Sequence, residues 1–260
     1  MRFSIITVVK NELPKIGLTV QSIKKQTFRD FEHIVFDANS NDGTSEFLKK
    51  NLDNQNLYFR ESDKGVYDAI NKSFQKVNGQ YIIIMHAGDF FYSENSLNQL
   101  SEFIYLNSSF DFYYSNILFY NKKKKNISRV WNIKSKNNDK LNFLKIAHTS
   151  LCIKKEISKK IFYDDKMKIS ADIDYLYNLC KNFNGKYFDS FFVYMEDQGL
   201  SNSKKYFYIK FKEDIRILYK RFNVFCLLVL IYKVLVKIPG FFYKKNIYNK
   251  NFRIEKKILD

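Results

Sequence analysis

Acidic residues at two places in this 260-residue chain have types and positions suited to catalysis or metal binding. Asp89 follows a glycine at the end of an apolar run, where a carboxylate faces solvent or a ligand. Together with a bound diphosphate, such a carboxylate is a natural partner of Mg²⁺ or Mn²⁺. A single Asp at a strand end is also a common turn or capping residue. The role of Asp89 therefore depends on which residues the fold brings beside it.

Asp172 and Asp174 form the second acidic site, at the start of a predicted helix over 172–180 with Ser170 as its cap. Residues two apart on a helix point to different sides, so the two carboxylates do not face the same ligand. Asp172, nearer the helix start, is the better candidate for a site residue. Both also suit a helix N-terminus, where the helix dipole stabilises negative charge.

The first part of the chain alternates strand and helix patterns, which predicts an α/β fold with a mostly parallel sheet flanked by helices. The strands are expected at 3–9, 31–36, 57–59 and 81–85, with helices around 16–23 and over 66–77. In such sheets ligands bind beyond the carboxyl ends of the strands. Polar segments follow all four strands, at 10–12, 37–44, 62–65 and 86–89. These four strand ends should converge on one rim.

The middle of the chain continues with strand patterns separated by polar turns. Strands are predicted at 110–120, 151–153 and 187–195, a hairpin tip at 121–125 and a mobile loop over 129–139. The motifs of dinucleotide-binding, P-loop, zinc-protease, serine-hydrolase and dithiol proteins do not occur. The three cysteines lack a metal-type spacing and are interpreted as reduced thiols of a cytosolic protein. The apolar run at 3–9 is too short for a secretion signal, so no export is predicted.

The last fifth of the chain is strongly basic. Residues 203–260 hold 15 Lys and Arg against 4 Asp and Glu, which is +11 of the net +17. A basic helix is expected at 206–221, followed by an apolar stretch at 222–236 that Pro239 and Gly240 end. The apolar stretch is too short to cross a bilayer but suits a helix in the headgroup plane of an anionic membrane. The alternative is a helix packed on the rest of the chain or in a dimer interface.

Five blocks in order along the chain resemble the catalytic domain of glycosyltransferase family 2, which has the GT-A fold. The likeness covers about residues 3–202 and is carried by the blocks 4–12, 31–44, 62–72, 79–89 and 170–176. It implies a catalytic domain at 1–202, with a nucleotide-binding half at 1–100 and an acceptor half at 101–202. Residues 203–260 would then be a basic, aromatic helical extension. The third and fourth blocks are most similar to bacterial members that build surface polysaccharides.

The resemblance also implies a donor site at the strand ends. Asp37 is followed by Ala38 where the family often has a second Asp, so one carboxylate that commonly contacts uracil is absent. Asp89 matches the last Asp of the family's DxD metal motif, whose first position is Ala87 here. One protein carboxylate and the donor phosphates would then hold Mn²⁺ or Mg²⁺. The residues that the likeness places around the donor are Thr7, Val9, Glu12, Asp37, Asp63, Lys64, Gly65, Asp68, Asn71, His86, Ala87 and Gly88.

On the acceptor side, Asp172 matches the family's general base. Asp174 would orient the helix or bind acceptor hydroxyls, and His148 resembles an acceptor-side block. His86 could contact the donor sugar, and residues 196–201 resemble the family's closing loop over the donor phosphates. Three acidic residues far apart in the chain, Asp37, Asp89 and Asp172, are thus expected around one pocket.

The reaction that the resemblance implies is an inverting transfer of a sugar from a nucleotide-diphosphate donor, with UDP expected as the nucleotide. The acceptor would be a polyprenol-linked or saccharide hydroxyl, reached at the cytoplasmic face of the plasma membrane. Oligomers could form through the C-terminal helices. One alternative is a sugar-phosphate nucleotidyltransferase, but its Gly- and Arg-rich first loop is absent at 7–12. The other is a nucleic-acid-binding protein using the basic tail, although no RNA-binding motif occurs and no nucleic-acid partner is expected.

Overall fold

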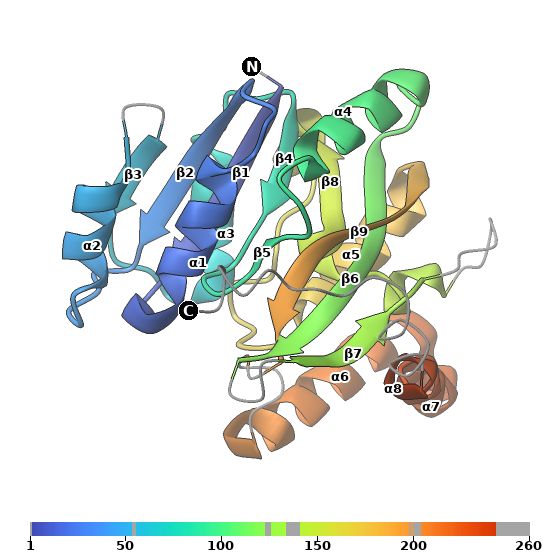
Figure 1. Ribbon diagram of the computed structural model, residues 1–260. Helices are drawn as coiled ribbons and strands as arrows, with labels where there is room; N and C mark the ends of the chain where they lie inside the picture. The colour runs from blue at the N-terminus through green and yellow to red at the C-terminus, as the bar shows by residue number, and fades with distance from the viewer. Residues whose placement is uncertain are drawn as a thin grey trace.

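The computed structural model describes residues 2–53, 56–122, 126–133, 141–197, 199 and 204–242. Within these residues the fold is α/β, with one nine-stranded sheet in the order β3-β2-β1-β4-β8-β6-β9-β5 and β7 paired to β6 (Figure 1). The strands are β1 (Phe3–Val9), β2 (Phe31–Asp37), β3 (Asn56–Arg60), β4 (Tyr81–Ile84), β5 (Phe90–Phe91), β6 (Phe112–Asn121), β7 (Asn126–Trp131), β8 (Leu151–Lys154) and β9 (Gly185–Glu196). The helices are α1 (Leu13–Lys24), α2 (Thr44–Asn51), α3 (Val66–Phe74), α4 (Ser96–Leu106), α5 (Ala171–Asn182), α6 (Phe207–Phe222), α7 (Cys226–Leu235) and α8 (Pro239–Phe242).

The first four strands of the sheet are parallel, as the alternating pattern predicts. β1 pairs with β2 and β4, and β2 pairs with β3, all in parallel register. Every residue of β1 and β2 is buried, because helices cover both faces of this part of the sheet. Ile16 of α1 packs with Val9 and Val35, whereas Ile70 of α3 packs with Ile6 and Ile34 on the other face. The carboxyl ends of these strands therefore meet at one edge.

The second part of the sheet differs from the prediction of a mostly parallel arrangement. β8 is antiparallel to both β4 and β6, and β5 is antiparallel to β9. Only β6 and β9 pair in parallel there. The expected hairpin is present, since Asn121 of β6 faces Asn126 of β7, although 123–125 lie outside the described residues. The predicted loop at 129–139 is wrong for Arg129–Trp131, which belong to β7; 134–140 are outside the described residues.

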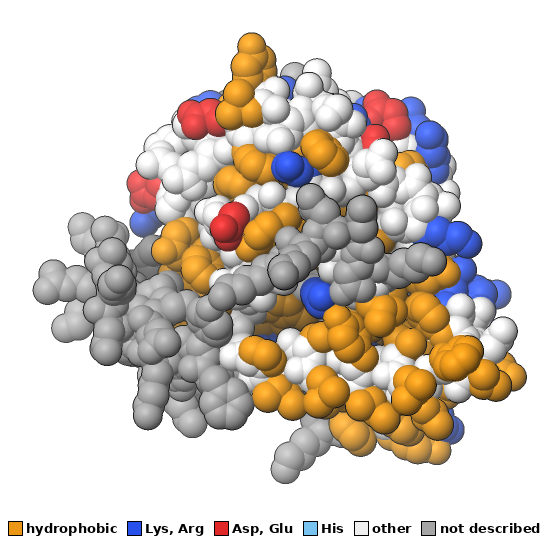
Figure 2. All heavy atoms as spheres, turned by 90° about the vertical axis from the view of Figure 1, so that its right-hand side faces the viewer, with side chains coloured by type: hydrophobic (Ala, Val, Ile, Leu, Met, Phe, Trp, Pro, Cys, Tyr) orange, Lys and Arg blue, Asp and Glu red, His pale blue; other side chains and the backbone are white. Residues whose placement is uncertain are grey.

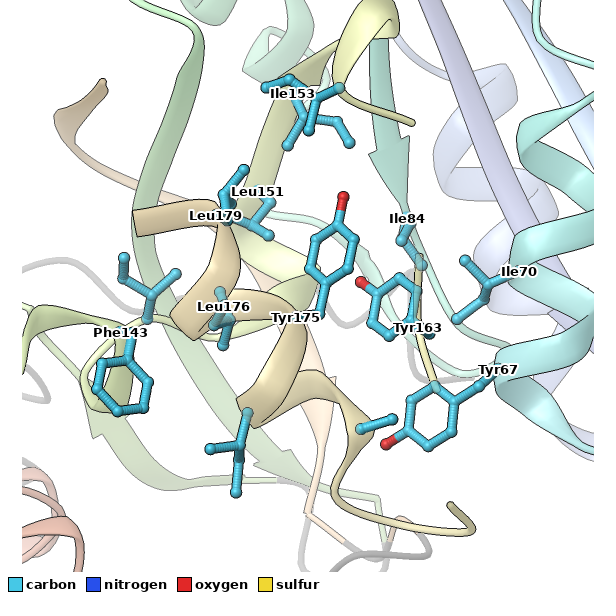
Figure 3. Close-up of a cluster of buried hydrophobic side chains, with 14 of the residues drawn as sticks. Tyr67, Ile70, Ile84, Phe143, Leu151, Ile153, Tyr163, Tyr175, Leu176 and Leu179 are labelled. Atoms are coloured by element: carbon cyan, nitrogen blue, oxygen red, sulfur yellow. The ribbon is translucent and has the colours of Figure 1, made fainter. Parts of the chain in front are cut away.

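Three tyrosines from separate segments join the parallel part of the sheet to α5. The ring of Tyr163 stacks on Tyr175 of α5 with centroids 4.1 Å apart, and on Tyr67 of α3 at 5.4 Å (Figure 3). The Tyr67 hydroxyl also donates a 2.6 Å hydrogen bond to the carbonyl oxygen of Ile169, just before α5. This stack fixes where the N-terminus of α5 lies relative to the sheet.

The C-terminal helices share the main hydrophobic core rather than standing apart from it. Ile217 and Leu218 of α6, and Cys226 and Val229 of α7, are buried in the cluster that contains the α5 side chains. Their other face is exposed and apolar, and Figure 2 shows these side chains gathered in its lower half, where α6 and α7 lie. In the described part of the chain, no helix combines the length and apolarity needed to cross a bilayer. Pro239 does not end the helical region but begins the short α8.

Candidate active site

A cavity of about 830 Å³ lies beyond the carboxyl ends of β1 and β4, between the parallel sheet and the C-terminal helices. Its walls come from loops of the first half, from β7, from the start of α5 and from α6 and α7. The cavity combines five carboxylate side chains with several basic and aromatic side chains. Its lining includes Val9, Lys10, Glu12, Lys15, Asp63, Lys64, Gly65, His86, Ala87, Asp89, Arg129, Trp131, Phe143, His148, Ser170, Asp172, Glu196, Lys210, Lys233 and Lys237.

Asp89 lies at the base of the cavity, in the turn between β4 and β5. Its backbone is fixed on both sides, since its N–H donates to the His86 carbonyl oxygen at 2.9 Å and its carbonyl oxygen accepts from the Thr19 hydroxyl at 2.8 Å. Gly88 makes the turn with φ +98°, a left-handed conformation that favours glycine. The carboxyl of Asp89 is 4% exposed, and its Oδ2 has no hydrogen-bond partner among the described residues. Burial, with a smaller contribution from the negative charge of Glu196, raises the pKa of Asp89 to about 8.

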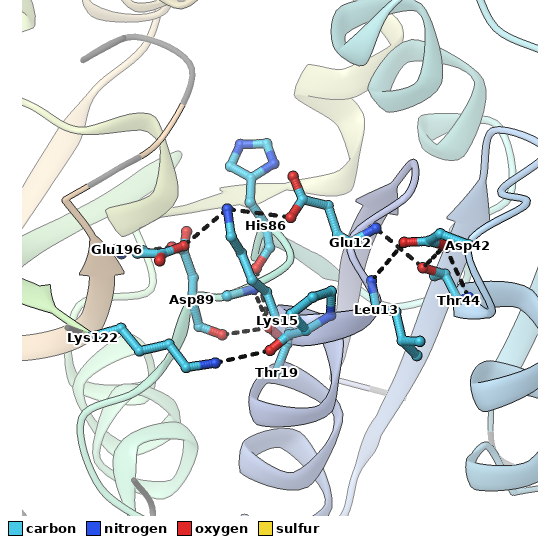
Figure 4. Close-up of polar contacts among 12 residues, drawn as sticks. Glu12, Leu13, Lys15, Thr19, Asp42, Thr44, His86, Asp89, Lys122 and Glu196 are labelled. Atoms are coloured by element: carbon cyan, nitrogen blue, oxygen red, sulfur yellow. Dashed lines mark hydrogen bonds and ion pairs between the residues drawn. The ribbon is translucent and has the colours of Figure 1, made fainter.

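A second carboxylate and a lysine lie next to Asp89. The Glu196 backbone N–H donates to Asp89 Oδ1 at 3.4 Å, and the Lys15 ammonium contacts Glu196 at 3.1 Å and Glu12 at 3.2 Å (Figure 4). Burial lowers the pKa of Lys15, but the two glutamates outweigh that effect and raise it. Lys15 therefore balances the negative charge beside Asp89.

The loop that carries Glu12 is held by the turn after β2. The Glu12 and Leu13 backbone N–H groups donate to the Thr44 hydroxyl and the Asp42 carboxylate, each at 3.1 Å (Figure 4). Asp42 also accepts from the Thr44 hydroxyl at 2.6 Å. Pro14 lies in the first turn of α1, where its missing N–H costs no hydrogen bond. These contacts direct the loop after β1 towards the cavity.

The residues around Asp89 fit a divalent metal ion only with help from a ligand. Asp89 offers a buried carboxylate oxygen without a partner, and Glu196 offers a second carboxylate nearby. Among the described residues, no group of three or more His, Cys, Asp or Glu side chains is close enough to form a complete metal site. Mg²⁺ and Mn²⁺ are often held by one or two carboxylates together with substrate phosphates. The donor set here matches that type of site.

Asp172 faces the same cavity from the start of α5. Its carboxyl makes no hydrogen bond or ion pair with another described residue, and Ser170, which precedes the helix, does not cap it through its side chain. Burial raises the pKa of Asp172, an effect that the nearby ammonium groups of Lys233, Lys210 and Lys237 reduce but do not cancel. A carboxylate with a raised pKa and no partner is a suitable proton acceptor.

His86 and His148 pair between the two acidic residues. Their Nε2 atoms are 3.0 Å apart, so one imidazole donates to the other. Burial lowers the pKa of His86 to about 3, assisted by the neighbouring imidazole, and lowers the pKa of His148 to about 4. Both rings are therefore neutral at pH 7. They can form hydrogen bonds with a ligand but do not carry charge.

Four basic side chains line the end of the cavity that is formed by the C-terminal helices; we call them the basic cluster. They are Arg129 of β7, Lys210 of α6, Lys233 of α7 and Lys237, which follows α7. Lys233 forms a buried 2.5 Å ion pair with Asp214. Burial, together with the charges of the other three cations, lowers the pKa of Lys237 to about 7. Burial alone lowers the pKa of Arg129 to about 10, against an opposite effect of Asp197.

Comparison with known proteins identifies the family. The model of glycosyl transferase family 2 matches residues 4–163, which is more than half of the chain. This chain belongs to glycosyl transferase family 2. The resemblance inferred from the five sequence blocks is thereby confirmed, and the cavity lies at the sheet edge where this family 2 protein was expected to bind its ligands.

Solved transferases share the GT-A fold of this family 2 protein. Staphylococcus aureus TarS, residues 1–349 in complex with UDP, superposes with a TM-score of 0.65 over 99% of this chain and 77% of that chain, at 17% identity. The mannosyltransferase PcManGT from Pyrobaculum calidifontis, in complex with GDP-Man and Mn²⁺, gives 0.63 over 90% of this chain and 69% of that chain, at 14% identity. The predicted GT-A fold is thus confirmed.

Among curated proteins, the family 2 chain is similar to a glycosyltransferase of PGL/p-HBAD biosynthesis from Mycobacterium bovis. The two sequences are 29% identical over 119 residues, which is 45% of this chain and 46% of the relative. The chain thus spans about half the length of the curated relatives it matches.

The structure brings most of the predicted family 2 site residues together. Ten of them line the cavity: Val9, Glu12, Asp63, Lys64, Gly65, His86, Ala87, Asp89, His148 and Asp172. Asp63 lies near Lys10, and burial raises its pKa more than that charge lowers it. Asp89 and Asp172, two of the three acidic residues expected to share a pocket, do share it.

Asp37, the third acidic residue, does not line the cavity. It is 0% exposed, and its carboxylate accepts hydrogen bonds from the Ser40 backbone N–H at 2.9 Å, from the Tyr58 hydroxyl at 2.8 Å and from the Ser45 hydroxyl. Burial would raise its pKa, but these hydrogen bonds outweigh burial and lower it. The expectation that the three acidic residues surround one pocket is therefore wrong for Asp37, which stabilises the turn after β2.

Five further predicted residues support the walls instead of lining the cavity. Thr7 contacts His33 inside the sheet, Gly88 donates its N–H to Thr19, and Asp68 pairs with Lys72 at 3.0 Å. Two of them join separate segments. The Asn71 amide holds the Tyr163 backbone, and Asp174 binds Arg221 of α6 at 2.7 Å.

The sequence interpretation missed the importance of Lys15 and of the basic cluster. Lys15 carries no sequence pattern that separates it from Lys24, the other lysine of α1. Lys233 did leave a signal, because it interrupts the apolar stretch at 222–236, where a buried charge needs a partner. The sequence indicated Glu196 only as the start of a closing loop. In the structure it is the last residue of β9, and its backbone N–H contacts Asp89.

Proposed function

We propose that this family 2 glycosyltransferase moves a sugar from a nucleotide-diphosphate donor, with UDP as the nucleotide, to an acceptor hydroxyl with inversion at the anomeric carbon. The main observation behind the proposal is that Asp89, whose Oδ2 has no hydrogen-bond partner among the described residues, and Asp172 line one cavity at the carboxyl ends of parallel strands. The cavity volume of about 830 Å³ suits a nucleotide sugar together with part of an acceptor.

The donor nucleotide would lie along the loops after β1 and β3. Val9, Glu12 and the segment Asp63–Gly65 line this side of the cavity, while Asp37 and Thr7 hold the strands behind it. The similarity to TarS, which was solved with UDP, supports uridine as the base. PcManGT was solved with GDP-Man, so the base identity requires a direct test.

The diphosphate would approach Asp89. A bound Mn²⁺ or Mg²⁺ would supply electrophilic stabilisation of the leaving diphosphate. Asp89 Oδ2 would hold the ion, and Glu196 could provide a second oxygen from its position beside Asp89. Lys15, which pairs with Glu196, would bind a phosphate oxygen of the donor.

Asp172 would take the proton of the acceptor hydroxyl. The hydroxyl oxygen then attacks the anomeric carbon as the bond to the diphosphate breaks, which inverts that carbon and leaves the nucleoside diphosphate as product. Burial raises the pKa of Asp172, which makes the carboxylate a stronger base. His86 and His148, both neutral, would orient sugar or acceptor hydroxyls by hydrogen bonds.

We further propose that the protein works on a membrane surface, with a polyprenol-linked or saccharide acceptor of surface-polysaccharide synthesis. The support is the exposed face of the C-terminal helices, where Phe225, Leu228 and Ile231 are each more than half exposed (Figure 2). Lys212, Arg216 and Lys220 are exposed on α6 beside it. Apolar side chains flanked by cations match the cytoplasmic leaflet, which carries anionic lipids.

A thermal-shift panel tests the donor proposal directly. UDP, GDP, ADP and their sugars would be compared with and without Mn²⁺, for the full chain and for Asp89→Asn. We expect UDP and UDP-sugars to raise the melting temperature most, and Mn²⁺ to enhance the shift only when Asp89 is present. Equal shifts for all nucleotides, or an unchanged Mn²⁺ effect in Asp89→Asn, would contradict the donor proposal.

A further inference from the structure

The basic cluster is built from parts of the chain that are far apart in sequence. Arg129 comes from β7, Lys210 from α6, and Lys233 and Lys237 from α7 and the turn after it. All four line the same cavity. The Arg129 guanidinium and the Lys237 ammonium also lie over the Trp131 ring, 5.1 Å and 5.5 Å from its centroid. The fold thus concentrates positive charge at one end of the site.

This concentration of charge favours an anionic ligand. Lys233 is paired with Asp214, whereas Lys237 forms no ion pair with any described residue. The pKa of Lys237 falls to about 7 because of burial and because Lys233, Lys210 and Arg129 repel its charge. The carboxylates around the cluster are Asp172, Asp197 and Asp214. An anion between the lysines would relieve their repulsion and form charge-assisted hydrogen bonds.

The three lysines of the basic cluster lie on the side of the proposed base. The charges that act on Asp172 are those of Lys233, Lys210 and Lys237, together with Asp214. The charges that act on Asp89 are those of Glu196 and Lys15. A ligand group held by the basic cluster would therefore sit next to the acceptor hydroxyl that Asp172 deprotonates.

We propose that the acceptor carries a phosphate group close to the hydroxyl that is glycosylated, and that Arg129, Lys210, Lys233 and Lys237 bind this phosphate. The inference rests on the proposed function, since it assigns the acceptor side of the same cavity. The phosphate could belong to a lipid headgroup or to a hydrophilic polyol or sugar phosphate. Apolar residues beside the cluster, among them Trp131 and Phe143, leave room for either source.

Trp131 gives a readout for this site alone, because it is the only tryptophan of the chain. Its fluorescence would be followed while glycerol 1-phosphate or geranyl phosphate is added to the full chain, with glycerol and geraniol as uncharged counterparts. We expect a saturable change with at least one phosphate and none with the alcohols. Binding of both phosphates would identify a phosphate site open to hydrophilic acceptors, whereas binding of geranyl phosphate alone would identify a lipid phosphate.

Matched variants distinguish a specific phosphate site from non-specific electrostatic attraction to a basic protein. Lys237→Gln should weaken phosphate binding by about tenfold or more, while Lys237→Arg should retain most of it. Lys50→Gln removes the same charge from an exposed position on α2 and should change the affinity less than twofold. The Trp131→Phe variant should lose the signal. No saturable change in the unmodified protein, or equal weakening in Lys237→Gln and Lys50→Gln, would overturn the proposal.

A competition experiment distinguishes this site from the donor site. The titration is repeated with saturating UDP and Mn²⁺, whose binding is verified independently by thermal shift. If phosphate still binds with UDP present, the anion site is separate, as proposed. If UDP displaces it, the basic cluster belongs to the donor and the acceptor inference fails. Failure of UDP to bind would count against the donor proposal. The Trp131 titration without UDP would still test the phosphate site.

Discussion

Asp172 and Asp89 are both carboxyl groups with raised pKa values, but their surroundings suit them to different tasks. Asp89 is almost fully buried beside a second carboxylate, a setting that suits a cation ligand. Asp172 faces the cavity among ammonium groups, which keep it more easily ionised than burial alone would allow. An ionised carboxylate beside the acceptor is what general-base catalysis requires.

Replacing Asp172 by Asn should therefore separate catalysis from binding. General-base catalysis typically contributes 10²–10⁴-fold, so turnover should fall to about a hundredth or less. The side chain remains the same size, and the thermal shift with nucleotide should persist. Steady-state transfer assays, together with nucleotide titrations, check both expectations. Near-normal turnover in Asp172→Asn would show that another group takes the proton.

Lys237 should make phosphate binding depend on pH. Its pKa of about 7 in the free protein means that it loses its proton as pH rises from 7 to 9, while phosphate monoesters stay dianionic. The other charged groups that face the Lys237 ammonium are Arg129, Lys210, Lys233 and Asp172. Arg129, whose pKa is about 10, stays charged over this pH range. Because binding favours the protonated lysine, affinity should fall by more than about tenfold from pH 7 to pH 9. Trp131 fluorescence titrations at pH 7 and pH 9 measure this change in affinity. Lys237→Arg should show a much weaker pH dependence. An equally strong dependence in Lys237→Arg would assign the effect to another group.

At the scale of elements, α6 holds the segment that presents Asp172. The Glu213 carboxylate accepts hydrogen bonds from three successive backbone N–H groups, those of residues 168, 169 and 170, at 2.7 to 2.9 Å. Arg221 of the same helix pairs with Asp174 of α5. The helices after residue 203 therefore form part of the wall of the site, in addition to the exposed apolar face.

Glu213→Ala should loosen this segment without touching a ligand. Loss of hydrogen bonds to a charged group costs about 1.5–3 kcal/mol, so the free energy of unfolding should fall by roughly 2 kcal/mol. Turnover should also fall because Asp172 is less well positioned, while the affinity for nucleotide should hardly change. Denaturant unfolding and separate kcat and KM values measure these effects. Glu102→Ala, an exposed change on α4, is the control; matching behaviour of the two variants would argue against a positioning role.

The elements also show what sequence could and could not predict. The β-branched run at 3–9 is observed without change as β1, and the α5 and β9 patterns lie within the observed elements. The direction in which β8 pairs was not predictable, because a buried strand has the same composition in either direction. The contact of Asp37 with its own turn and the gathering of the basic cluster both depend on tertiary contacts. The spacing of residues along the chain does not predict such tertiary contacts.

At the scale of the whole molecule, the net charge of +17 and the exposed apolar face would both favour the proposed binding to an anionic membrane. Leu228 and Ile231 of α7 are 64% and 56% exposed, while the opposite side of the same helix is buried in the core. Removal of the C-terminal helices would expose that core. Surface substitutions therefore test membrane binding better than truncation does.

The double variant Leu228→Glu/Ile231→Glu should detach the protein from membranes. Each buried aliphatic side chain contributes about 1.5–3 kcal/mol, so partitioning should fall more than tenfold. Flotation with phosphatidylglycerol-containing vesicles measures this, and Tyr105→Glu/Leu106→Glu on α4 is the matched control. Equal flotation of both variants would contradict membrane docking. A dimer that dissociates only in the α7 variant, with flotation unchanged, would show that the face binds a second copy instead.

The most direct test of the whole account is a crystal structure of the full chain with UDP and Mn²⁺, using anomalous scattering to locate the manganese. We expect one manganese peak bonded to Asp89 Oδ2 and to the diphosphate, with the nucleoside along Val9 and Asp63–Gly65 and with Asp172 facing the open side of the cavity. Manganese away from Asp89, or UDP bound outside this cavity, would contradict it.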